Sequence, residues 1–368
     1  MRETVAEINL SNLKFNFLNI RKRVKQTKVM AVIKADAYGH GMIQCAKALE
    51  TLGDKSPDYY GFALLEEAIE LRSSKIKKPV LIFAPVQLSE INNYLKYNIE
   101  PTVASEKQIK ELIGYSGRKL KLQVNVDTGM GRIGISYDSA IELITKLTAN
   151  KKIEITGIYT HFATSDDENK KYANLQLERF KYIVETLKQK NICTGLAHAA
   201  NSGAILDMSD SYFDMVRPGI ALYGYYPSLE TSESIKLKPV MSLVSKVSTI
   251  KEIRKGESVS YGRLFIAKDN TRVATVPLGY ADGLNRNLTN KIYGIIKGKL
   301  YSQVGRVTMD RISFEIKNDK VREGDKIILL GKSGNNEIDA WHWSSLLNTI
   351  PYEITCNISK RVPRTYKA

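Results

Sequence analysis

The strongest constraint on the fold is a regular alternation of short apolar runs with segments of helical period between residues 29 and 225. Runs rich in Val, Ile and Tyr are typical of buried strands. Eight such runs alternating with helices predict a (β/α)₈ barrel rather than a doubly wound sheet. The predicted strands are Val29–Lys34, Tyr60–Ala63, Val80–Phe83, Ile99–Val103, Lys121–Val126, Ile153–Thr160, Thr194–His198 and Met215–Arg217.

The segments between these strands carry apolar residues on one helical face. Met42, Cys45 and Leu49, for example, recur at intervals of three and four residues and form one stripe. The other predicted helices are Leu64–Leu71, Leu88–Tyr97, Ser105–Ile113, Ser139–Leu147, Tyr172–Lys188 and Asn201–Leu206. In such barrels the functional groups come from the carboxyl ends of the strands. The polar residues that fall there are Lys34, Asp127, His161, His198 and Arg217.

After the polar stretch Pro227–Lys238 the pattern changes to short β-rich runs separated by glycines. This pattern is typical of a small, mostly antiparallel β domain. We therefore predict a barrel domain over residues 1–236 and a β-rich domain over residues 237–368. Val5–Leu10 also has the pattern of a strand, and it is a candidate to join the β domain. The predicted strands of this domain are Val240–Ile250, Arg272–Pro277, Lys299–Val304, Arg311–Ile316 and Lys326–Leu330.

One lysine at the end of the first barrel strand is a candidate nucleophile. The apolar run Val29–Ile33 leads directly into Lys34. Desolvation disfavours an ammonium group and lowers its pKa, which suits a lysine that forms a Schiff base. For a single lysine, a structural role with the amine reaching water is the alternative. Tyr38, Gly39 and Gly41 favour the functional interpretation, because they place a hydroxyl and a closely approachable backbone beside the amine.

A glycine-rich segment, Gly129–Gly134, matches the dinucleotide-binding pattern G-x-G-x-x-G and follows a predicted strand. In a dinucleotide-binding unit the helix opens within the glycines, whereas the helical pattern here resumes only near Tyr137. An arginine side chain would also stand where the backbone should approach the pyrophosphate. We therefore interpret the segment as a loop that presents Arg132 at the barrel mouth.

Two further segments place hydrogen-bond donors at strand ends. Arg217 is followed by Gly219 and Ile220, whose NH groups suit a phosphate, although a turn capped by a salt bridge is the alternative. Asn201 and Ser202 begin a predicted helix, and a helix N-terminus favours anions.

His161 and His198 flank the same strand ends, but a lone histidine is more often a satisfied core residue than a participant. No spacing typical of a zinc site occurs, so we expect no metal.

These segments resemble the signatures of the bacterial alanine racemases. The first is Val29–Gly41 and the second is Val126–Gly134. The matching segments further along the chain are Val259–Arg263, Leu278–Gly283, Gly305–Asp310, Pro351–Cys356 and Arg361–Arg364. The resemblance implies the same barrel and β domain, pyridoxal 5'-phosphate as cofactor, and interconversion of L-alanine and D-alanine, with D-alanine supplied for peptidoglycan.

The resemblance also implies roles for individual residues. Lys34 forms a Schiff base with the cofactor and is the base on the D face of the substrate, whereas Tyr261 is the base on the L face. Tyr261 comes from the partner subunit of a homodimer with shared active sites. The implied cofactor-binding residues are Lys34, Tyr38, Arg132, His161, His198, Asn201, Ser202, Arg217, Gly219, Ile220 and Tyr352. The implied substrate-binding residues are Arg132, Met309, Tyr280 and Asp310.

One position departs from the family pattern. The family usually carries a carbamylated lysine two residues before the aspartate of the second signature, and this chain has Asn125 there. A neutral amide supplies no negative charge to hold Arg132. A bound anion such as chloride in its place is a hypothesis that the resemblance suggests.

Composition sets the remaining bounds. The net charge of +16 is compatible with nucleic-acid or membrane-surface binding, but no aromatic-interleaved basic stripe accompanies it. We therefore expect a lysine-rich solvated surface. The three cysteines, Cys45, Cys193 and Cys356, form no disulfide pattern. With no apolar leader at the N-terminus and no membrane span, we expect a cytoplasmic protein.

Three alternatives remain open at this point. A serine racemase or a racemase of broader specificity would have the same fold. A barrel-type amino-acid decarboxylase also uses a Schiff-base lysine, but the ring nitrogen of its cofactor normally faces an acidic residue, and Arg217 argues against it. A non-catalytic carrier of the cofactor would lack the second domain with Tyr261.

Overall fold

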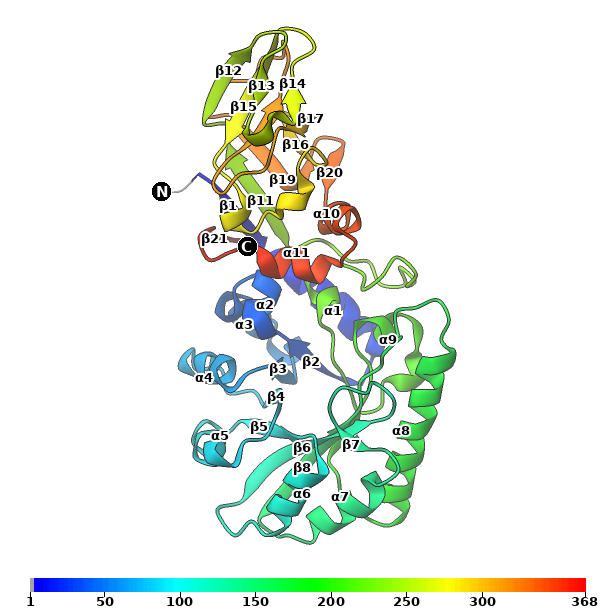
Figure 1. The fold of residues 1–368 in the computed structure, drawn as a ribbon. Helices are drawn as coiled ribbons and strands as arrows, with labels where there is room; N and C mark the ends of the chain where they lie inside the picture. Colours follow the sequence, from blue (N-terminus) through cyan, green and yellow to red (C-terminus); the bar gives the residue numbers. More distant parts are fainter. Residues whose placement is uncertain (1–2) are drawn as a thin grey trace. The chain divides into compact units, whose positions relative to one another are not determined.

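The computed structural model describes residues 3–368, so the first two residues of the predicted barrel domain lie outside the description. The chain divides into two compact units (Figure 1). The first, called the barrel unit here, comprises Lys14–Ala37 and Met42–Leu237. The second, the β unit, comprises the segment that ends at Leu13 together with Tyr38–Gly41 and Lys238–Ala368.

Eight parallel strands of the barrel unit form a nearly closed ring in the order β10-β2-β3-β4-β5-β6-β8-β9. Backbone hydrogen bonds from Asp214 to Ala197 and from Arg217 to Ala200 connect its two ends. The short β7 (Ile135–Ser136) pairs with β6 outside this path. The predicted (β/α)₈ barrel is confirmed. Its strands are β2 (Lys28–Val32), β3 (Tyr59–Phe62), β4 (Val80–Pro85), β5 (Glu100–Val103), β6 (Leu120–Asp127), β8 (Ile153–Tyr159), β9 (Leu196–His198) and β10 (Met215–Val216).

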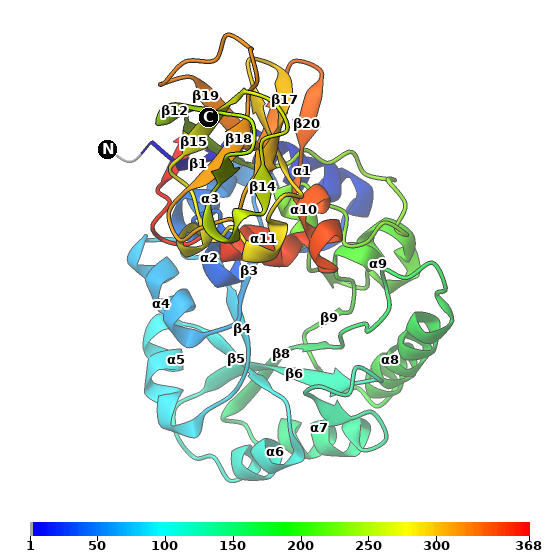
Figure 2. The same cartoon turned by 45° about the horizontal axis from the view of Figure 1, so that its top comes forward.

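Helices follow the strands in alternation, and Figure 2 shows α4 to α9 around the outside of the ring. The helices of this part of the chain are α1 (Leu10–Val24), α2 (Lys34–Gly39), α3 (Met42–Glu50), α4 (Leu65–Ser73), α5 (Ile91–Tyr97), α6 (Glu106–Ile113), α7 (Ala140–Thr148), α8 (Lys171–Gln189) and α9 (Ser202–Asp207). Short 3₁₀ turns occupy Gly53–Lys55, Leu88–Glu90, Ser209–Ser211 and Ile220–Tyr223.

Burial on one face explains the position of the longest helix, α8. Its buried side chains recur every three or four residues, so they form a single stripe that packs toward the strands. Each large apolar side chain buried in this way contributes about 1.5–3 kcal/mol. The stripe consists of Ala173, Leu177, Phe180, Ile183 and Leu187. Side chains from different strands meet in one buried cluster, namely Met30, Tyr59, Leu81, Tyr159 and Met215.

The β unit is built on one twisted sheet in the order β12-β15-β18-β17-β16-β19-β11-β1-β21. All of its pairings are antiparallel except that of β1 with β21. Its strands are β1 (Val5–Asn9), β11 (Met241–Lys246), β12 (Thr249–Ile253), β15 (Thr271–Val276), β16 (Tyr293–Ile296), β17 (Lys299–Val304), β18 (Ile312–Glu315), β19 (Lys326–Ser333), β20 (Asn336–Ile338) and β21 (Arg364–Lys367). A separate hairpin joins β13 (Ser258–Val259) to β14 (Phe265–Ile266).

The first strand of the chain belongs to this second unit. β1 pairs with β11 on one side and with β21 on the other, so residues 5–9 lie between strands that follow more than two hundred residues later. Two helices, α10 (Ala340–Leu347) and α11 (Pro351–Asn357), complete the unit with 3₁₀ turns at Tyr261–Arg263, Tyr280–Asp282 and Arg286–Leu288. No helix within residues 3–368 is long and apolar enough to cross a membrane.

The structure also differs from the predicted elements. Val240–Ile250 was predicted as one strand, and this is wrong: it is divided between β11 and β12. The break lies at Val247 and Ser248, whose amides donate to Asp325 and Thr275 on different neighbouring segments. Helix α10 was not predicted, although Asp339 caps it by accepting a hydrogen bond from the His342 amide.

Candidate active site

The five polar residues predicted at strand ends lie there in the barrel unit. Asp127 and His198 are the last residues of β6 and β9, and Arg217 directly follows β10. Lys34 and His161 are each the second residue after their strands. Because all strands of the ring are parallel, these residues share one end of the barrel.

The half-buried Lys34 follows a completely apolar strand end. Its Nζ atom lies 5.9 Å from the ring centroid of Phe83 on β4, the second strand along the ring from β2, a distance at which an ammonium is attracted to an aromatic face. The amine is therefore held over the barrel end by an apolar surface.

The segment after Lys34 has an unusual backbone. Ala35, Asp36, Ala37 and Tyr38 have φ angles of 52°, 53°, 55° and 53°, so α2 is a left-handed turn made of residues other than glycine. A left-handed conformation costs roughly 1–2 kcal/mol for each such residue. Strain of this kind is retained where surrounding contacts enforce it, and it gathers at functional sites.

Two carboxylates hold this left-handed turn. The Ala35 amide donates to Glu67 Oε1 at 2.6 Å, and the Met42 amide donates to Asp36 Oδ1 at 2.8 Å. Glu67 Oε2 also accepts from the amides of Ala63 and Leu64 at 3.0 and 3.1 Å. One glutamate therefore joins the start of α4 to the residue that follows Lys34.

Replacing Glu67 by alanine is expected to lower the free energy of unfolding by about 2–4 kcal/mol, because it removes three hydrogen bonds to a charged group. Urea denaturation measures the change, and limited proteolysis should cleave near residues 35–38 sooner than in the unchanged protein. The neighbouring Glu66, which is exposed, provides the control variant Glu66→Ala. Equal stability of the two variants would contradict this role of Glu67.

Arg217 is buried and held in a fixed orientation. Its Nη1 atom donates to His198 Nδ1 at 2.8 Å, and Nη2 donates to the Thr160 and Ala199 carbonyls at 2.7 and 2.9 Å. Within residues 3–368 its hydrogen bonds run from these two nitrogens, so the Nε hydrogen and the second Nη1 hydrogen are the donors left for a ligand. Burial lowers the pKa of Arg217 to about 10, so the guanidinium remains charged at neutral pH.

The pKa of His161 reflects the positive charges at this end of the barrel. Burial, followed by the charges of Arg217, Arg132 and Lys34, lowers the pKa of His161 to about 3. The charges that act on this imidazole within the described residues are all positive. A site with three cations and a neutral imidazole suits an anionic ligand.

The lowered pKa values of His161 and His198 should make the stability of the protein depend on pH. The pKa of His198 is also lowered, by burial and then by Arg217. The unfolded chain binds protons below pH 6.5 or so, whereas the folded chain keeps both imidazoles neutral, so stability falls as the pH drops below this value. Between pH 7.5 and 5.5 we expect a loss of about 1 kcal/mol per histidine. Urea denaturation of His161→Asn should have a weaker pH dependence; an unchanged one would contradict the assignment.

The loop Gly129–Gly134 is not the start of a helix, which agrees with its interpretation as a presenting loop. The Asp127 carboxylate accepts from the amides of Gly129 and Gly131, and the chain continues into the short β7. Arg132 at the centre of this loop is exposed.

Asn125 is buried on β6, opposite Tyr159 on β8. The Tyr159 hydroxyl lies 2.9 Å from Thr102 Oγ1. Burial, opposed by hydrogen bonds with Thr102 and Asn125 and by two arginines, raises the pKa of Tyr159 to about 12. Asn125 therefore belongs to a network of uncharged side chains, in which the Tyr159 hydroxyl keeps its hydrogen at neutral pH.

The residues predicted to bind a phosphate form two groups, one in each unit. In the barrel unit, Ser202 Oγ accepts from the amides of Gly219 and Ala221 at 2.9 and 3.3 Å. Asn201 caps α9 by accepting from the Ala204 amide. The Gly219 amide thus donates to Ser202 Oγ in this structure, and its contact with a phosphate stays a prediction.

In the β unit, Tyr38 lies beside Tyr352, with ring centroids 5.9 Å apart. Burial raises the pKa of Tyr38, so its hydroxyl stays protonated. Gly39 has a φ of +83°, and a Cβ atom there would lie 2.2 Å from the Thr355 carbonyl oxygen, so glycine is required. The Arg364 Nε atom donates to the Gly39 carbonyl at 3.0 Å and fixes this close approach.

A cavity within the β unit is lined by four of the predicted site residues, Tyr261, Tyr280, Met309 and Asp310. We call it the Tyr261 pocket. Its lining consists of Tyr261, Tyr280, Arg286, Arg306, Val307, Thr308, Met309, Asp310 and Arg311. Tyr261 is 73% exposed, and it lies between residues with left-handed φ angles, Ser260 and Gly262. Such a turn presents the phenol outward.

Close backbone contact brings Tyr280 and Met309 together. The Tyr280 amide donates to the Thr308 carbonyl, and the Ala281 amide donates to the Met309 carbonyl. A Cβ atom at Gly279 would lie 2.3 Å from the Met309 carbonyl group, so glycine allows the two segments to meet. Asp310 forms an ion pair with Arg361 at 2.7 Å.

Sequence reasoning missed several polar residues at these sites. Arg286, Arg306 and Arg311 line the Tyr261 pocket, and Glu100 and Gln123 are buried inside the barrel. For the last two, a signal was present, because a charged or amide side chain within a buried strand needs a partner.

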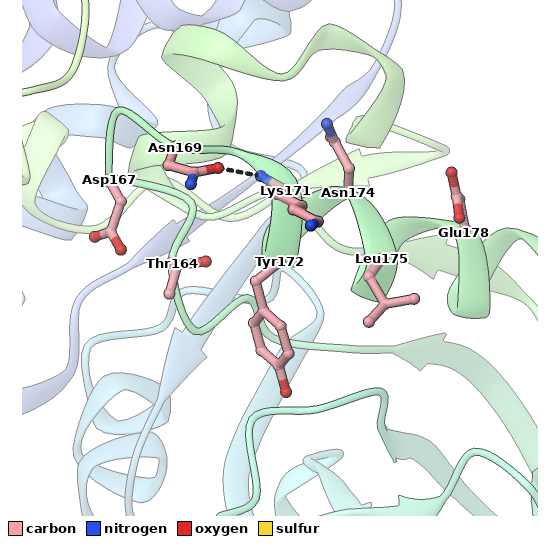
Figure 3. Close-up of a pocket in the computed structure, with 8 residues that line it drawn as sticks. All are labelled: Thr164, Asp167, Asn169, Lys171, Tyr172, Asn174, Leu175 and Glu178. Atoms are coloured by element: carbon pink, nitrogen blue, oxygen red, sulfur yellow. Dashed lines mark hydrogen bonds between the residues drawn. The ribbon is translucent and has the colours of Figure 1, made fainter.

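Another depression lies on the loop after β8 and the first turns of α8 (Figure 3). It is lined by Thr164, Asp167, Asn169, Lys171, Tyr172, Asn174, Leu175 and Glu178. None of these residues was predicted to act, and the one interaction drawn among them is the local bond from the Lys171 amide to Asn169 Oδ1.

Within residues 3–368, no group of three His, Cys, Asp or Glu residues is arranged to hold a metal.

The fold and the strand-end residues together define a class: a (β/α)₈-barrel enzyme with an appended β unit and a lysine after its first barrel strand. Comparison with known proteins narrows this class. Residues 8–227 match the family model described as "Alanine racemase, N-terminal domain", and residues 240–366 match "Alanine racemase, C-terminal domain". The chain therefore belongs to the alanine racemase family.

Individual relatives support this conclusion over the full length. The chain is 42% identical to alanine racemase 2 of Caldanaerobacter subterraneus, with 100% of this chain and 95% of the relative covered. It is 40% identical to alanine racemase of Carboxydothermus hydrogenoformans, with both chains fully covered. The alanine racemase structure of Clostridium difficile matches at a TM-score of 0.92 and 37% identity, covering 100% of this chain and 96% of that one.

A Bacillus anthracis alanine racemase structure with bound L-Ala-P matches equally well, at a TM-score of 0.92 and 34% identity over 100% of this chain and 96% of that one. The predicted family and activity are confirmed: the chain is an isomerase that interconverts L-alanine and D-alanine. Members of this family generally depend on pyridoxal 5'-phosphate.

Proposed function

We propose that the chain racemises alanine by a two-base mechanism, with Lys34 and Tyr261 as the bases and with pyridoxal 5'-phosphate held at the carboxyl end of the barrel. The observation that carries the proposal is the position of three cations, Lys34, Arg132 and Arg217, after strands at one end of the barrel, where their charges help to lower the pKa of His161. A phosphorylated cofactor and a substrate carboxylate are both anions, so the residues present fit them. When bound, the cofactor withdraws electrons from the substrate α-carbon and so makes its proton removable.

Racemisation removes the α-proton from one face and returns a proton to the other, so each face needs its own acid–base group. Lys34 would hold the cofactor through its amine and, once released by the substrate, would serve the D face. The Tyr261 phenol would serve the L face. Arg217 would lie at the cofactor's ring nitrogen, where its charge would disfavour protonation of that nitrogen and leave more of the work to the two bases.

The other site residues would position the ligands. Arg132 and the Met309 amide would take the substrate carboxylate, with Tyr280 and Asp310 at the entrance. His161, His198 and Asn201 would support the cofactor's surroundings. The residues for its phosphate would be Tyr38, Ser202, Gly219, Ile220 and Tyr352.

We infer that the working form is a homodimer in which Tyr261 and Met309 complete the partner's site. Tyr261, Leu264, Ile266 and Met309 are apolar or aromatic side chains between 47% and 73% exposed, which is costly in water and suits an interface. Sedimentation should therefore detect a species of twice the 41.4 kDa chain mass. A fully active monomer would contradict the shared site. In a bacterial cell the D-alanine formed would supply peptidoglycan synthesis.

The substrate preference is tested with a D-amino-acid-oxidase-coupled assay on L-alanine and L-serine. We expect D-alanine as product and a kcat/KM for L-serine at least about tenfold lower, because a pocket fitted to a methyl group disfavours an added hydroxyl. Equal rates would favour the second candidate, a racemase of broader specificity. Decarboxylation, detected as released carbon dioxide, would contradict both.

A further inference from the structure

A continuous row of buried polar side chains crosses the interior of the barrel. Gln123 Nε2 donates to Glu100 Oε2 at 2.8 Å, and Gln123 Oε1 lies 2.8 Å from His198 Nε2. His198 Nδ1 in turn lies 2.8 Å from Arg217 Nη1. We call these four residues the Glu100 relay. Each is at most 6% exposed, and they come from β5, β6, β9 and the residue after β10.

The hydrogen-bond chemistry allows only one direction along this relay. Glu100 Oε2 accepts from Gln123 and also from Thr156 Oγ1 at 2.8 Å, so the amide NH₂ of Gln123 must face it. The amide oxygen therefore faces His198, whose Nε2 must carry the hydrogen. A neutral imidazole then has a lone pair on Nδ1, which accepts from the Arg217 guanidinium. A turned amide would set two oxygens against each other at an ionised Glu100, and it would place the His198 hydrogen on Nδ1, facing the Arg217 guanidinium, which can only donate.

A glycine, Gly157, leaves the space that the Gln123 side chain occupies. The strand between β6 and β9 is β8, and Gly157 on this strand lies against Gln123. A Cβ atom at Gly157 would lie 2.9 Å from Cδ and Oε1 of Gln123 and 2.9 Å from the carbonyl oxygen of Leu196 on β9, closer than such contacts occur. The backbone of Gly157 needs no left-handed conformation, so glycine is required here by the space for Gln123 together with the close approach of the Leu196 backbone.

We propose that Glu100 and Gln123 are positioning residues for racemisation, which fix His198 as the Nε2–H tautomer and thereby aim Arg217 at the cofactor. The proposal rests on the proposed function in one respect, namely that Arg217 faces the cofactor. Loss of the carboxylate would free the Gln123 amide to turn over. His198 would then carry its hydrogen on Nδ1, opposite a guanidinium that can only donate.

Two substitutions at residue 100 separate this role from a structural one. Glu100→Gln keeps an oxygen that can accept from Gln123, whereas Glu100→Leu removes it. In protein labelled with ¹⁵N-histidine, with and without cofactor, the unchanged protein and Glu100→Gln should show a nonprotonated His198 Nδ1. Glu100→Leu should show a protonated or averaged Nδ1. The chain has four histidines, so His198→Asn assigns the signal by its absence.

The glycine provides an independent test that removes no polar group. Gly157→Ala should displace Gln123, alter the His198 Nδ1 signal and lower kcat for alanine about tenfold with little change in KM. Gly114→Ala is the matched control, because a Cβ atom there has no neighbour closer than 3.8 Å. Its signal and kcat should be unchanged.

The ¹⁵N readout does not depend on catalysis, so the two proposals fail separately. An inactive unchanged protein would contradict the proposed function and leave the tautomer assignment standing. The same His198 tautomer in folded Glu100→Leu and Gly157→Ala as in the unchanged protein would overturn the role of the relay. So would a kcat loss in Glu100→Gln as large as in Glu100→Leu.

Discussion

Replacing Lys34 by alanine is expected to lower kcat for alanine racemisation by at least about 10⁴-fold. The variant would lose both the covalent attachment of the cofactor and one of the two proton-transfer groups. The oxidase-coupled assay measures the loss. Lys28→Ala is the matched control, since Lys28 is exposed at the opposite end of the same strand, β2, and this variant should retain full activity.

Chemical labelling tests the attachment of the cofactor to Lys34 independently of the racemisation rate. Borohydride reduction of the cofactor-loaded protein, followed by digestion and peptide sequencing, should place the label on the peptide that contains Lys34. The Lys34→Ala variant should yield no label. A label on another lysine, or an active Lys34→Ala protein, would show that the amine after β2 is not the attachment point.

Replacing Tyr261 by phenylalanine is expected to lower kcat by about 10²–10⁴-fold, the usual contribution of one general acid–base group. Only the hydroxyl is removed, so folding and cofactor loading should stay unchanged. Tyr293 is also exposed in the β unit, on β16, and Tyr293→Phe is therefore the control. Unaltered racemisation by Tyr261→Phe in both directions would exclude the phenol as a base.

Mixing the two inactive variants tests whether the site is shared. If subunits reassort, a dimer of one Lys34→Ala chain and one Tyr261→Phe chain contains one intact site, built from Lys34 of the second and Tyr261 of the first. Random pairing should then restore about a quarter of the activity of the unchanged protein. No recovery after confirmed subunit exchange would mean that both bases come from the same chain.

The barrel could be predicted from sequence because its signals are local. Each strand is a short apolar run, and the observed bounds differ from the predicted ones by at most two residues at their N-terminal ends, as for Thr194 and Leu196. The strand-end rule then located Lys34, His161 and Arg217 without knowledge of their contacts. The prediction of Tyr261 rests on the family signatures alone, because by local pattern it is one tyrosine among twenty.

Features set by distant contacts could not be predicted. Nothing in Ala35–Tyr38 indicates a left-handed turn, since none of these residues is glycine; Glu67, about thirty residues later, helps to enforce it. Likewise, Glu100 and His198 are joined only through Gln123 on a strand between them in the chain. Such arrangements depend on which strands become neighbours, and this is settled only when the whole ring has formed.

The position of β1 between β11 and β21 has a consequence for how the protein is made on the ribosome. Val5–Asn9 is translated before the other described strands, but its partner Arg364–Lys367 is translated after all of them. At bacterial elongation rates of roughly 5–20 residues per second, the edge of β1 that pairs with β21 stays unpaired for tens of seconds. During that interval the unpaired edge is exposed to pairing with other molecules, so binding by a chaperone would protect the nascent chain.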